Sequence, residues 1–559
     1  MKKLISVLLS VIMALSLLSV AVSAEEIPLV ITVANDLHLD SASSTAETVK
    51  KHNSISEEYA HVSGGGQLQY ESLAIIKAFL EQAGKNDSRY LILPGDITDR
   101  GTPEDHEMLT GLFREFEETY GKEIFVVPGN HDMFKTSVAE FESYYKDFGY
   151  SSAIANDPGS ASYTADLEGG YRLIAIDSCL PGESPVDIPE ERIDWIEAQC
   201  KAAKAEGKKV FAIMHHNLLE HYILASKIHS TAVATKDSMR LADILADNNV
   251  KYIFTAHTHN HDITSYTSAA GNTVYDVVTN SLTQYPCDYR VVSFGEKVQI
   301  KTEYIRKIDT SLLPGGIHEN TLALAESNFL MYAKNCTYLG VESMIKSYTK
   351  AAQLKRILKT DDETINSVVD KAATKIEEVV SLPFYAENET EEGKSIESMA
   401  AERGIELPET DYRNMVHLAL VIYQANAEGD ENFTGYSDEM ILMSRALAVA
   451  LNYALSDVTT EEFTAILSYV ASLLGVDISQ DIISAVGGSI DKFRGCELFV
   501  TSVAVPLFAE FGTDDAPADM NVTLPGYGKT DSAVSFLDTI KDFFRKIFDF
   551  FYMIFAMLA

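Results

Sequence analysis

The chain has 559 residues, with 45 Lys or Arg against 82 Asp or Glu, so its formal net charge is −37. Hydrophobic residues make up 46% of it, which excludes a wholly disordered chain, because disorder requires low apolar content. The acidity argues against a protein that coats nucleic acid, since phosphate backbones are bound by Lys and Arg. An acidic chain that handles phosphate needs bound cations to supply positive charge. The five cysteines are scattered, which argues against a disulfide framework and against a thiolate zinc site.

The N-terminus predicts a secretory signal peptide over residues 1–24. Residues 1–3 are basic, residues 4–20 form an apolar run, and residues 22–24 offer small side chains for cleavage. The alternative is an uncleaved membrane anchor. We therefore expect a protein that is secreted or associated with the cell envelope, on the extracytoplasmic side.

Between residues 25 and 310 short β-rich runs alternate with helical stretches, which predicts a layered α/β domain. The expected strands cover residues 29–34, 90–93, 124–127, 173–176, 210–214, 252–255, 273–279 and 290–293. The clearest helical stretches between them cover residues 67–82, 189–205 and 237–247.

The remainder of the chain has helical periodicity and no strand signal, which predicts a helical accessory domain over residues 311–512. Expected helices cover residues 322–332, 362–380, 411–424, 438–455 and 460–474. Residues 513–533 are rich in Gly, Pro, Asp and Thr and are expected to form a linker. Nothing in this half concentrates ligand-type side chains, so its expected role is structural or regulatory.

The last segment, residues 534–559, predicts an amphipathic helix. Phe536, Ile540, Phe543 and Ile547 recur at three- and four-residue steps and form one apolar stripe. Such a helix suits a membrane surface or a partner protein. The pattern fits a helix docked on its own protein equally well, and this choice stays open.

Polar residues of the ligand type follow the apolar strands of the α/β half, one set per strand. In open α/β sheets, sites gather beyond the carboxyl ends of the strands, so these side chains are expected to meet in one crevice. The sets are Asp36 and His38, Asp96 and Asp99, Asn130 and His131, His215 and His216, and His257 and His259.

The spacing within these sets suits metal ligation. Asp36 with His38, and His257 with His259, stand two residues apart, which on an extended strand end puts both side chains on the same side. Asp96 offers two oxygens and so would bridge two ions. Mixed His, Asp and Asn ligands suit Mn, Fe or Zn rather than Ca alone. Glycines at 95 and 129 permit tight turns beside the site.

In order along the chain these sets read Asp-x-His, Gly-Asp-x-x-Asp-Arg, Gly-Asn-His-Asp, a lone His, and Ala-His-x-His. Over residues 27–302 this series resembles the calcineurin-like metallophosphoesterase family. The resemblance implies a layered β-sandwich domain flanked by helices, ahead of the mostly α-helical C-terminal domain. It also implies a dinuclear-metal phosphoric ester hydrolase, a phosphodiesterase or phosphatase, in which a metal-bound hydroxide attacks phosphorus.

The resemblance also assigns roles, residue by residue. Two divalent ions (Mn, Fe or Zn) are expected, one held by Asp36, His38 and His259, the other by Asn130, His215 and His257, with Asp96 between them. His131 resembles the family's acid, which Asp99 would orient, and Arg100 would contact a phosphate oxygen. Ala256 stands where the family has Gly. Either His215 or the adjacent His216 coordinates, and the alternation of side chains along the strand favours His215.

The expected substrate is a small phosphoester, and the metal ligands do not say which one. No nucleic-acid coat binding is expected, while docking to a membrane surface or a protein through the C-terminal helix is possible. The rival interpretation is a non-catalytic, envelope-associated docking protein that retains the phosphoesterase fold.

Overall fold

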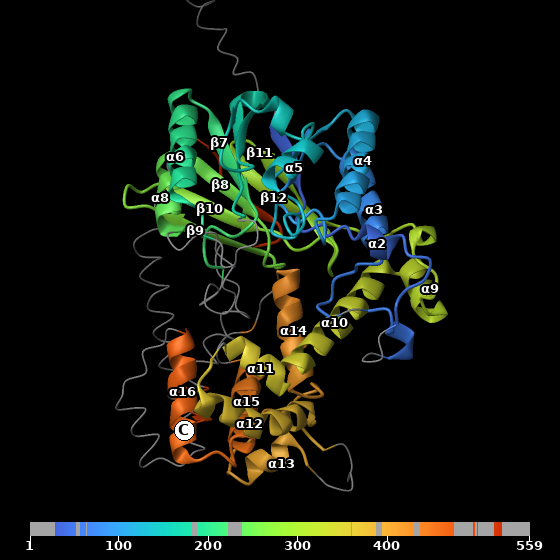
Figure 1. Cartoon of the computed structure of the whole chain (residues 1–559), viewed down its shortest axis with the longest axis vertical. Helices are drawn as coiled ribbons and strands as arrows, with labels where there is room; N and C mark the ends of the chain where they lie inside the picture. The colour runs from blue at the N-terminus through green and yellow to red at the C-terminus, as the bar shows by residue number, and fades with distance from the viewer. Residues whose placement is uncertain are drawn as a thin grey trace, which may run out of the picture.

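The computed structural model (Figure 1) describes most of the two halves of the chain. The described residues are 28–51, 56–62, 64–179, 187–221, 238–358, 360–386, 394–429, 433, 437–474, 496–497, 500 and 519–527. The predicted signal peptide and the predicted amphipathic C-terminal helix lie outside these residues.

Two β-sheets form the α/β region, which confirms the predicted sandwich. The six-stranded sheet has the order β13-β12-β11-β1-β2-β3, and the seven-stranded sheet has the order β4-β5-β6-β7-β8-β10-β9. The first contains β1 (Leu29–Val33), β2 (Tyr90–Leu93), β3 (Glu123–Val126), β11 (Asp288–Phe294), β12 (Lys297–Tyr304) and β13 (Val522–Pro525). The second contains β4 (Ala155–Asn156), β5 (Tyr163–Leu167), β6 (Tyr171–Ile176), β7 (Lys209–Met214), β8 (Val250–Thr255), β9 (Asp262–Thr267) and β10 (Thr273–Val278).

One apolar core lies between the two sheets. Ile31 and Val33 of β1 pack in one apolar cluster with Phe211 of β7 and Phe254 of β8, and all four side chains are fully buried. The central strands β2, β7 and β8 are buried along nearly their whole length, as is typical of parallel strands that are covered on both faces. This rigid sandwich fixes where the strand ends, and therefore the loops that follow them, can lie.

Helices cover the outer faces of both sheets. α3 (Ser72–Lys85) and α4 (Pro103–Tyr120) pack on the first sheet, and α6 (Glu190–Ala205) and α8 (Ser238–Asp247) on the second. The sequence of α4 specifies both of its ends. The side chain of Thr102 forms a capping box with Asp105, and Gly121 ends the helix with φ of +64°.

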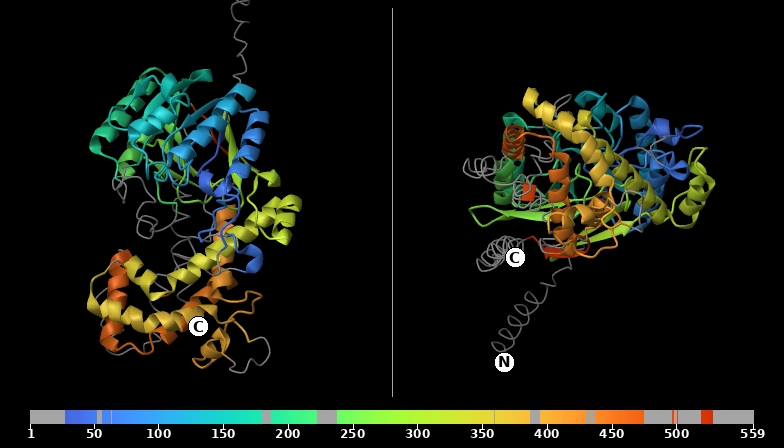
Figure 2. Two further views of the ribbon diagram at one scale, coloured as in Figure 1. Left: turned by 45° about the vertical axis from the view of Figure 1, so that its right-hand side comes forward. Right: turned by 90° about the horizontal axis from the view of Figure 1, so that it is seen from below.

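The C-terminal half is helical, as predicted. Asn328 (φ −153°) separates α9 from α10, so the helix expected over residues 322–332 is two helices. In Figure 2 the later helices gather at one end of the molecule. Among the described helices none is long and apolar enough to cross a membrane. The helices are α9 (Glu319–Ser327), α10 (Phe329–Tyr348), α11 (Ala351–Leu358), α12 (Glu363–Ser381), α13 (Ile396–Ala401), α14 (Met415–Glu428), α15 (Asp438–Ala454) and α16 (Thr460–Leu474).

After the helical half the chain returns to the first sheet. β13, within the range expected to be a linker, pairs antiparallel with β12, with Val298 opposite Leu524. The hydroxyl of Tyr527 donates to the carbonyl oxygen of Val210 at 2.5 Å, and Tyr252 donates to that of Pro525 at 2.5 Å. This return segment (residues 519–527) is therefore part of the sandwich.

Candidate metal centre

Loops from both sheets bring the predicted ligands to one edge of the sandwich. β1, β2 and β3 run parallel in the first sheet, and β7, β8 and β10 run parallel in the second. The ligand sets follow the carboxyl ends of β1, β2, β3, β7 and β8, and the structure brings their side chains within 4.8 Å of one another in overlapping groups. Asp36, His38, Asp96 and His215 are buried, at 0–1% exposure.

The backbone at these ligands has left-handed φ angles. Asp36 and His38 have φ of +48° and +42°, Asp96 has +45°, and His257 and His259 have +71° and +52°. The expectation that Asp36 and His38, and likewise His257 and His259, share one side of an extended strand end is therefore wrong. They converge because the chain turns sharply at the strand end, into a conformation that non-glycine residues adopt only at a cost of about 1–3 kcal/mol each. Such strain at many neighbouring positions is typical of functional sites.

One group of ligands contains Asp36, His38 and His259. The Nε2 atoms of His38 and His259 lie 3.2 Å apart. Oδ1 of Asp36 lies 4.0 Å from Nε2 of His38 and 3.6 Å from Nε2 of His259. Three donor atoms from strand ends of two different sheets thus face the same small space.

A second group contains Asn130, His215 and His257. Nε2 of His215 lies 3.0 Å from Oδ1 of Asn130 and 3.2 Å from Nδ1 of His257. Asp96 lies between the two groups, since its Oδ2 is 3.3 Å from Nε2 of His215 and 3.9 Å from Nε2 of His38. The structure therefore brings together all seven residues that the sequence singles out as metal ligands.

Glycine is required where the loops touch. A Cβ on Gly129 would lie 2.2 Å from the backbone nitrogen of Asp96, and one on Gly95 would lie 2.9 Å from Nδ1 of His215. Gly95 also has φ of +102°. Larger residues would push the loops apart, so the two glycines permit the close approach that the sequence predicts.

Asp132 ties two of these loops together, a role that the sequence analysis did not assign. Its carboxylate accepts from the backbone nitrogens of Thr98 at 2.8 Å and Gly129 at 2.9 Å, and from the Thr98 hydroxyl at 2.7 Å. Burial and the neighbouring Asp96 raise the pKa of Asp132 to about 7. Its place in the Gly-Asn-His-Asp series was the available signal.

His131 lies at the rim of the centre, with 29% of its side chain exposed. Its Nδ1 donates to the main-chain carbonyl of Asp99 at 2.7 Å, while Oδ1 of Asp99 lies 3.5 Å from Nδ1 of His38. Asp99 thus orients His131 through its main-chain carbonyl, while the side-chain carboxylate of Asp99 lies nearer His38. Arg100 is 45% exposed, and its guanidinium donates to Asp40 at 2.5 Å.

The carboxylates control the charge of the buried imidazoles. Burial lowers the pKa of His215, but the carboxylates of Asp96 and Asp36 outweigh it and raise that pKa to about 9. Burial alone would raise the pKa of Asp96, yet His215, His131 and His38 hold it well below its usual range. The site therefore concentrates negative charge that is balanced by cationic groups.

The donor atoms fit a divalent cation. Nδ1 of His259 lies 2.9 Å from Oε1 of Gln284, and Nδ1 of His38 lies 3.5 Å from Oδ1 of Asp99. With the proton of each ring on Nδ1, both Nε2 lone pairs would face the same space, where the two atoms lie 3.2 Å apart. Two lone pairs at 3.2 Å repel each other unless a cation lies between them. His216 differs from His215, since its Nδ1 bonds the Ser178 hydroxyl at 2.8 Å, although it still lies near His257.

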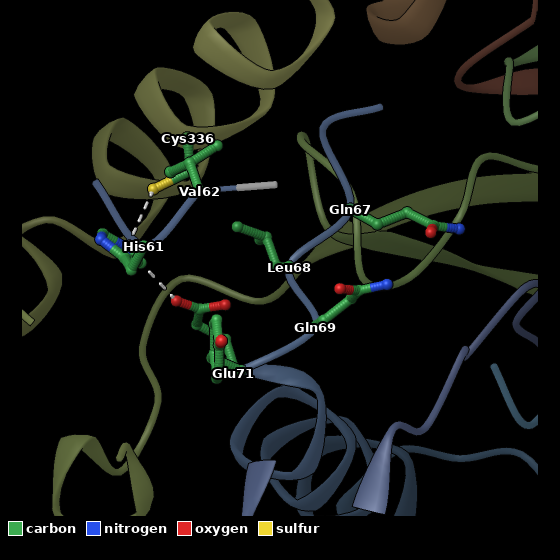
Figure 3. Close-up of a pocket in the computed structure, with 8 residues that line it drawn as sticks. His61, Val62, Gln67, Leu68, Gln69, Glu71 and Cys336 are labelled. Carbon is green, nitrogen blue, oxygen red and sulfur yellow. Dashed lines mark hydrogen bonds and ion pairs between the residues drawn. The ribbon is translucent and has the colours of Figure 1, made fainter. Parts of the chain in front are cut away.

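A separate small cavity lies where residues 61–71 meet α10 (Figure 3). Nε2 of His61 lies 3.1 Å from the Tyr332 hydroxyl, 3.8 Å from Glu71 and 3.9 Å from Sγ of Cys336. Burial lowers the pKa of His61 to about 4 and raises that of Glu71, which favours the neutral form of both. This cluster joins the α/β region to the helical half.

Comparison with known families gives a match to the calcineurin-like phosphoesterases over residues 29–261. The matched range begins at β1 and ends just after His259. It therefore contains every predicted ligand and stops before the helical half.

Individual proteins are also similar to this chain. The chain is 28% identical over 207 residues to a probable glycerophosphodiester phosphodiesterase of Arcobacter nitrofigilis, covering 36% of this chain and 68% of that protein. It is 25% identical over 235 residues to a probable cyclic nucleotide phosphodiesterase of Rhodococcus erythropolis, covering 41% and 70%. A dimetal phosphatase from Danio rerio aligns over 50% of this chain and 98% of its own, with 11% identity and a TM-score of 0.37.

Proposed function

Because residues 29–261 belong to the calcineurin-like phosphoesterase family, whose members are metal-dependent hydrolases, we propose that this protein hydrolyses phosphodiesters at the centre built around Asp96. The single observation that carries the proposal is the position of Asp96, within 4 Å of imidazole nitrogens from both ligand groups. The two relatives are named a probable glycerophosphodiester phosphodiesterase and a probable cyclic nucleotide phosphodiesterase, and these names support a diester substrate.

We assign one ion to Asp36, His38 and His259 and another to Asn130, His215 and His257, with Asp96 shared. We favour His215 over His216, because Nε2 of His215 lies 3.0 Å from Oδ1 of Asn130 and 3.3 Å from Oδ2 of Asp96. Mixed nitrogen and oxygen donors suit Mn, Fe or Zn. When bound, such ions lower the pKa of water and neutralise charge on phosphoryl oxygens.

The chain's own residues supply the proton and orient the substrate. The carbonyl of Asp99 holds the Nδ1 proton of His131, which directs Nε2 toward the centre, 4.0 Å from Oδ2 of Asp96. A protonated Nε2 there can donate to the leaving oxygen as the P–O bond breaks. Arg100, held by Asp40 at the exposed rim, is placed to attract an anionic substrate.

The test uses the purified full-length chain, treated with chelator and reloaded with Mn²⁺. We expect turnover of bis-p-nitrophenyl phosphate, with slower turnover of p-nitrophenyl phosphate. Bound metal without activity on either compound would favour a docking protein that retains the fold. A reversed preference would mean a phosphatase.

We also propose that the protein acts outside the cytoplasm, on the support of the basic, apolar and small-residue pattern in residues 1–24. N-terminal sequencing of the exported protein tests this: a mature chain that begins at Glu25 is expected. An intact Met1 in the purified protein would contradict cleavage.

A further inference from the structure

Gln284 links the metal centre to the helical half. It follows β10, the next parallel strand at the same edge of the second sheet, and is 3% exposed. Its Oε1 lies 2.9 Å from Nδ1 of His259, and its Nε2 donates to the hydroxyl of Tyr423 in α14. Tyr423 thus stands two side chains away from a donor atom of the centre.

We propose that Tyr423 is a positioning residue, which holds the proposed metal ligand His259 in place through Gln284. The helical half would then complete the surroundings of one ion site rather than only covering the sandwich. This inference rests on the proposed function, because it requires His259 to coordinate an ion.

The chemistry of His259 explains why it needs such a partner. Its Nε2 faces His38 at 3.2 Å and Asp36 at 3.6 Å, so this is the nitrogen that would coordinate. An imidazole that coordinates through Nε2 must carry its proton on Nδ1 and needs an acceptor there. Oε1 of Gln284 is that acceptor.

Tyr423 then determines how the amide of Gln284 is held. With Oε1 used by His259, the amide N–H groups point to the other side and need an acceptor, because Gln284 is buried. The Tyr423 hydroxyl accepts from them. Without this hydroxyl, the amide nitrogen of Gln284 would lose its acceptor. A flip of the amide would then turn Oε1 away from His259 and leave Nδ1 of His259 without its acceptor.

His259 differs in this respect from His131 and His215. Nδ1 of His131 faces the carbonyl of Asp99 at 2.7 Å, and Nδ1 of His215 faces that of Pro94 at 3.2 Å. Both partners are backbone atoms of the α/β region, fixed by the sheet. The orientation of His259 depends instead on side chains, and the last of them belongs to the helical half.

Further contacts hold the same loop. The backbone nitrogen of Tyr285 donates to Thr337 of α10 at 3.1 Å, and its hydroxyl donates to Glu428 of α14 at 2.5 Å. Figure 1 shows α10 and α14 between the sheets and the group formed by α11, α12, α13, α15 and α16. Residues 284–285 are therefore held by hydrogen bonds to both helices, which fixes the position of the Tyr423 hydroxyl relative to Gln284.

The experiment compares Mn²⁺ binding to the full-length protein and to Tyr423→Phe and Gln284→Ala, by titration calorimetry after chelator treatment. We expect one of the two ions to bind on the order of 10-fold more weakly in both variants, the effect typical of losing an outer-shell partner. Excess Mn²⁺ should restore kcat, and KM should not change. Tyr385→Phe is the matched control, because it removes a hydroxyl that bonds the carbonyls of Leu407 and Pro408 within the helical half.

Wild-type affinity in Tyr423→Phe would overturn the inference, whether or not Gln284→Ala binds more weakly. An equal loss in Tyr385→Phe would also overturn it, since the effect would then be general to the helical half. If the wild-type protein binds no divalent ion, the proposed function itself fails. Thermal unfolding of each variant without metal checks that the fold is intact, and Gln284→Asn replaces Gln284→Ala if the latter unfolds.

Discussion

Oδ2 of Asp96 lies 3.3 Å from Nε2 of His215, across the gap between a loop of the first sheet and a strand end of the second. The same carboxylate accepts from the backbone nitrogen of His131 at 2.7 Å. One side chain thus fixes both sheets and the proposed acid in one arrangement, so its replacement is the most direct test of the centre.

Asp96→Asn should lower turnover by more than about 100-fold, beyond the usual effect of an outer-shell partner, and should also reduce bound metal. The amide keeps the volume but loses the charge that two ions would share. Metal content by mass spectrometry and turnover of bis-p-nitrophenyl phosphate measure both effects. Asp166→Asn is the control, because Asp166 pairs with Arg172 away from the centre. Full metal loading in Asp96→Asn would refute the shared-ligand assignment.

His131→Ala should lower turnover by roughly 10²- to 10⁴-fold while both ions stay bound, as expected for loss of a general acid. The effect depends on the leaving group. A p-nitrophenolate leaves without help, so its diester should lose less activity than a diester with an alkyl leaving group. Parallel kinetics on the two diesters measure this. An equal loss on both would argue that His131 only shapes the site.

Removal of metal should abolish activity and lower the melting temperature. Ions that bind the folded chain stabilise it by about 2.7 kcal/mol at 100 times their dissociation constant, because the unfolded chain lacks the assembled ligands. Scanning calorimetry with and without Mn²⁺ measures the shift. We expect a smaller shift in Asp96→Asn, and an unchanged melting temperature in the wild-type protein would contradict the metal assignment.

Stability should fall as pH rises from 6.5 toward 10, in part through His221. Burial lowers its pKa, but the carboxylates of Asp276 and Asp262 outweigh burial and raise it to about 10 from 6.5. The folded state therefore holds a proton that the unfolded state releases, and this stability is complete below pH 6.5 and is lost as pH passes 10. Melting temperatures of wild type and His221→Asn across this range test it. If the melting temperatures of the two proteins change with pH in the same way, His221 is not charged in the folded state.

Loss of Tyr527 should destabilise the sandwich by about 3 kcal/mol, a usual cost for truncating a large packed side chain. Its ring packs near Tyr171, Tyr252 and Phe294, and its hydroxyl bonds Val210. Chemical denaturation of Tyr527→Ala measures the change. Tyr348→Ala, at an exposed position on α10, should have little effect.

The sequence predicts the central strands and the convergence of their ends, because β1, β2, β7 and β8 are mostly apolar and ligand-type residues follow each of them within three residues. It misses β4, β5, β9 and β12. In β9 and β12 the exposed faces carry polar side chains that weaken the apolar signal: β12 alternates buried and exposed residues over Lys297–Tyr304. It also misses β13, whose pairing with β12 spans more than 200 residues and so leaves no local pattern.

Within the centre, residue type and order along the chain identify the ligands. The backbone conformation at these residues could not be predicted from the sequence. Left-handed φ angles at Asp36 and His257 contradict local preference and persist only because the surrounding loops enforce them. Gln284 carries no motif. Its position after β10 is the one available signal, and its role depends on Tyr423, which is distant in sequence.

The chain leaves the first sheet and rejoins it at adjacent positions. The hydroxyl of Thr302, near the end of β12, donates to the carbonyl of Met520 at 2.8 Å, just before β13 begins. Everything between them is topologically an insertion into a β-hairpin. A short designed turn could join β12 directly to β13 and leave both sheets whole, but the shortened chain would lack Tyr423, the last side chain in the link to His259.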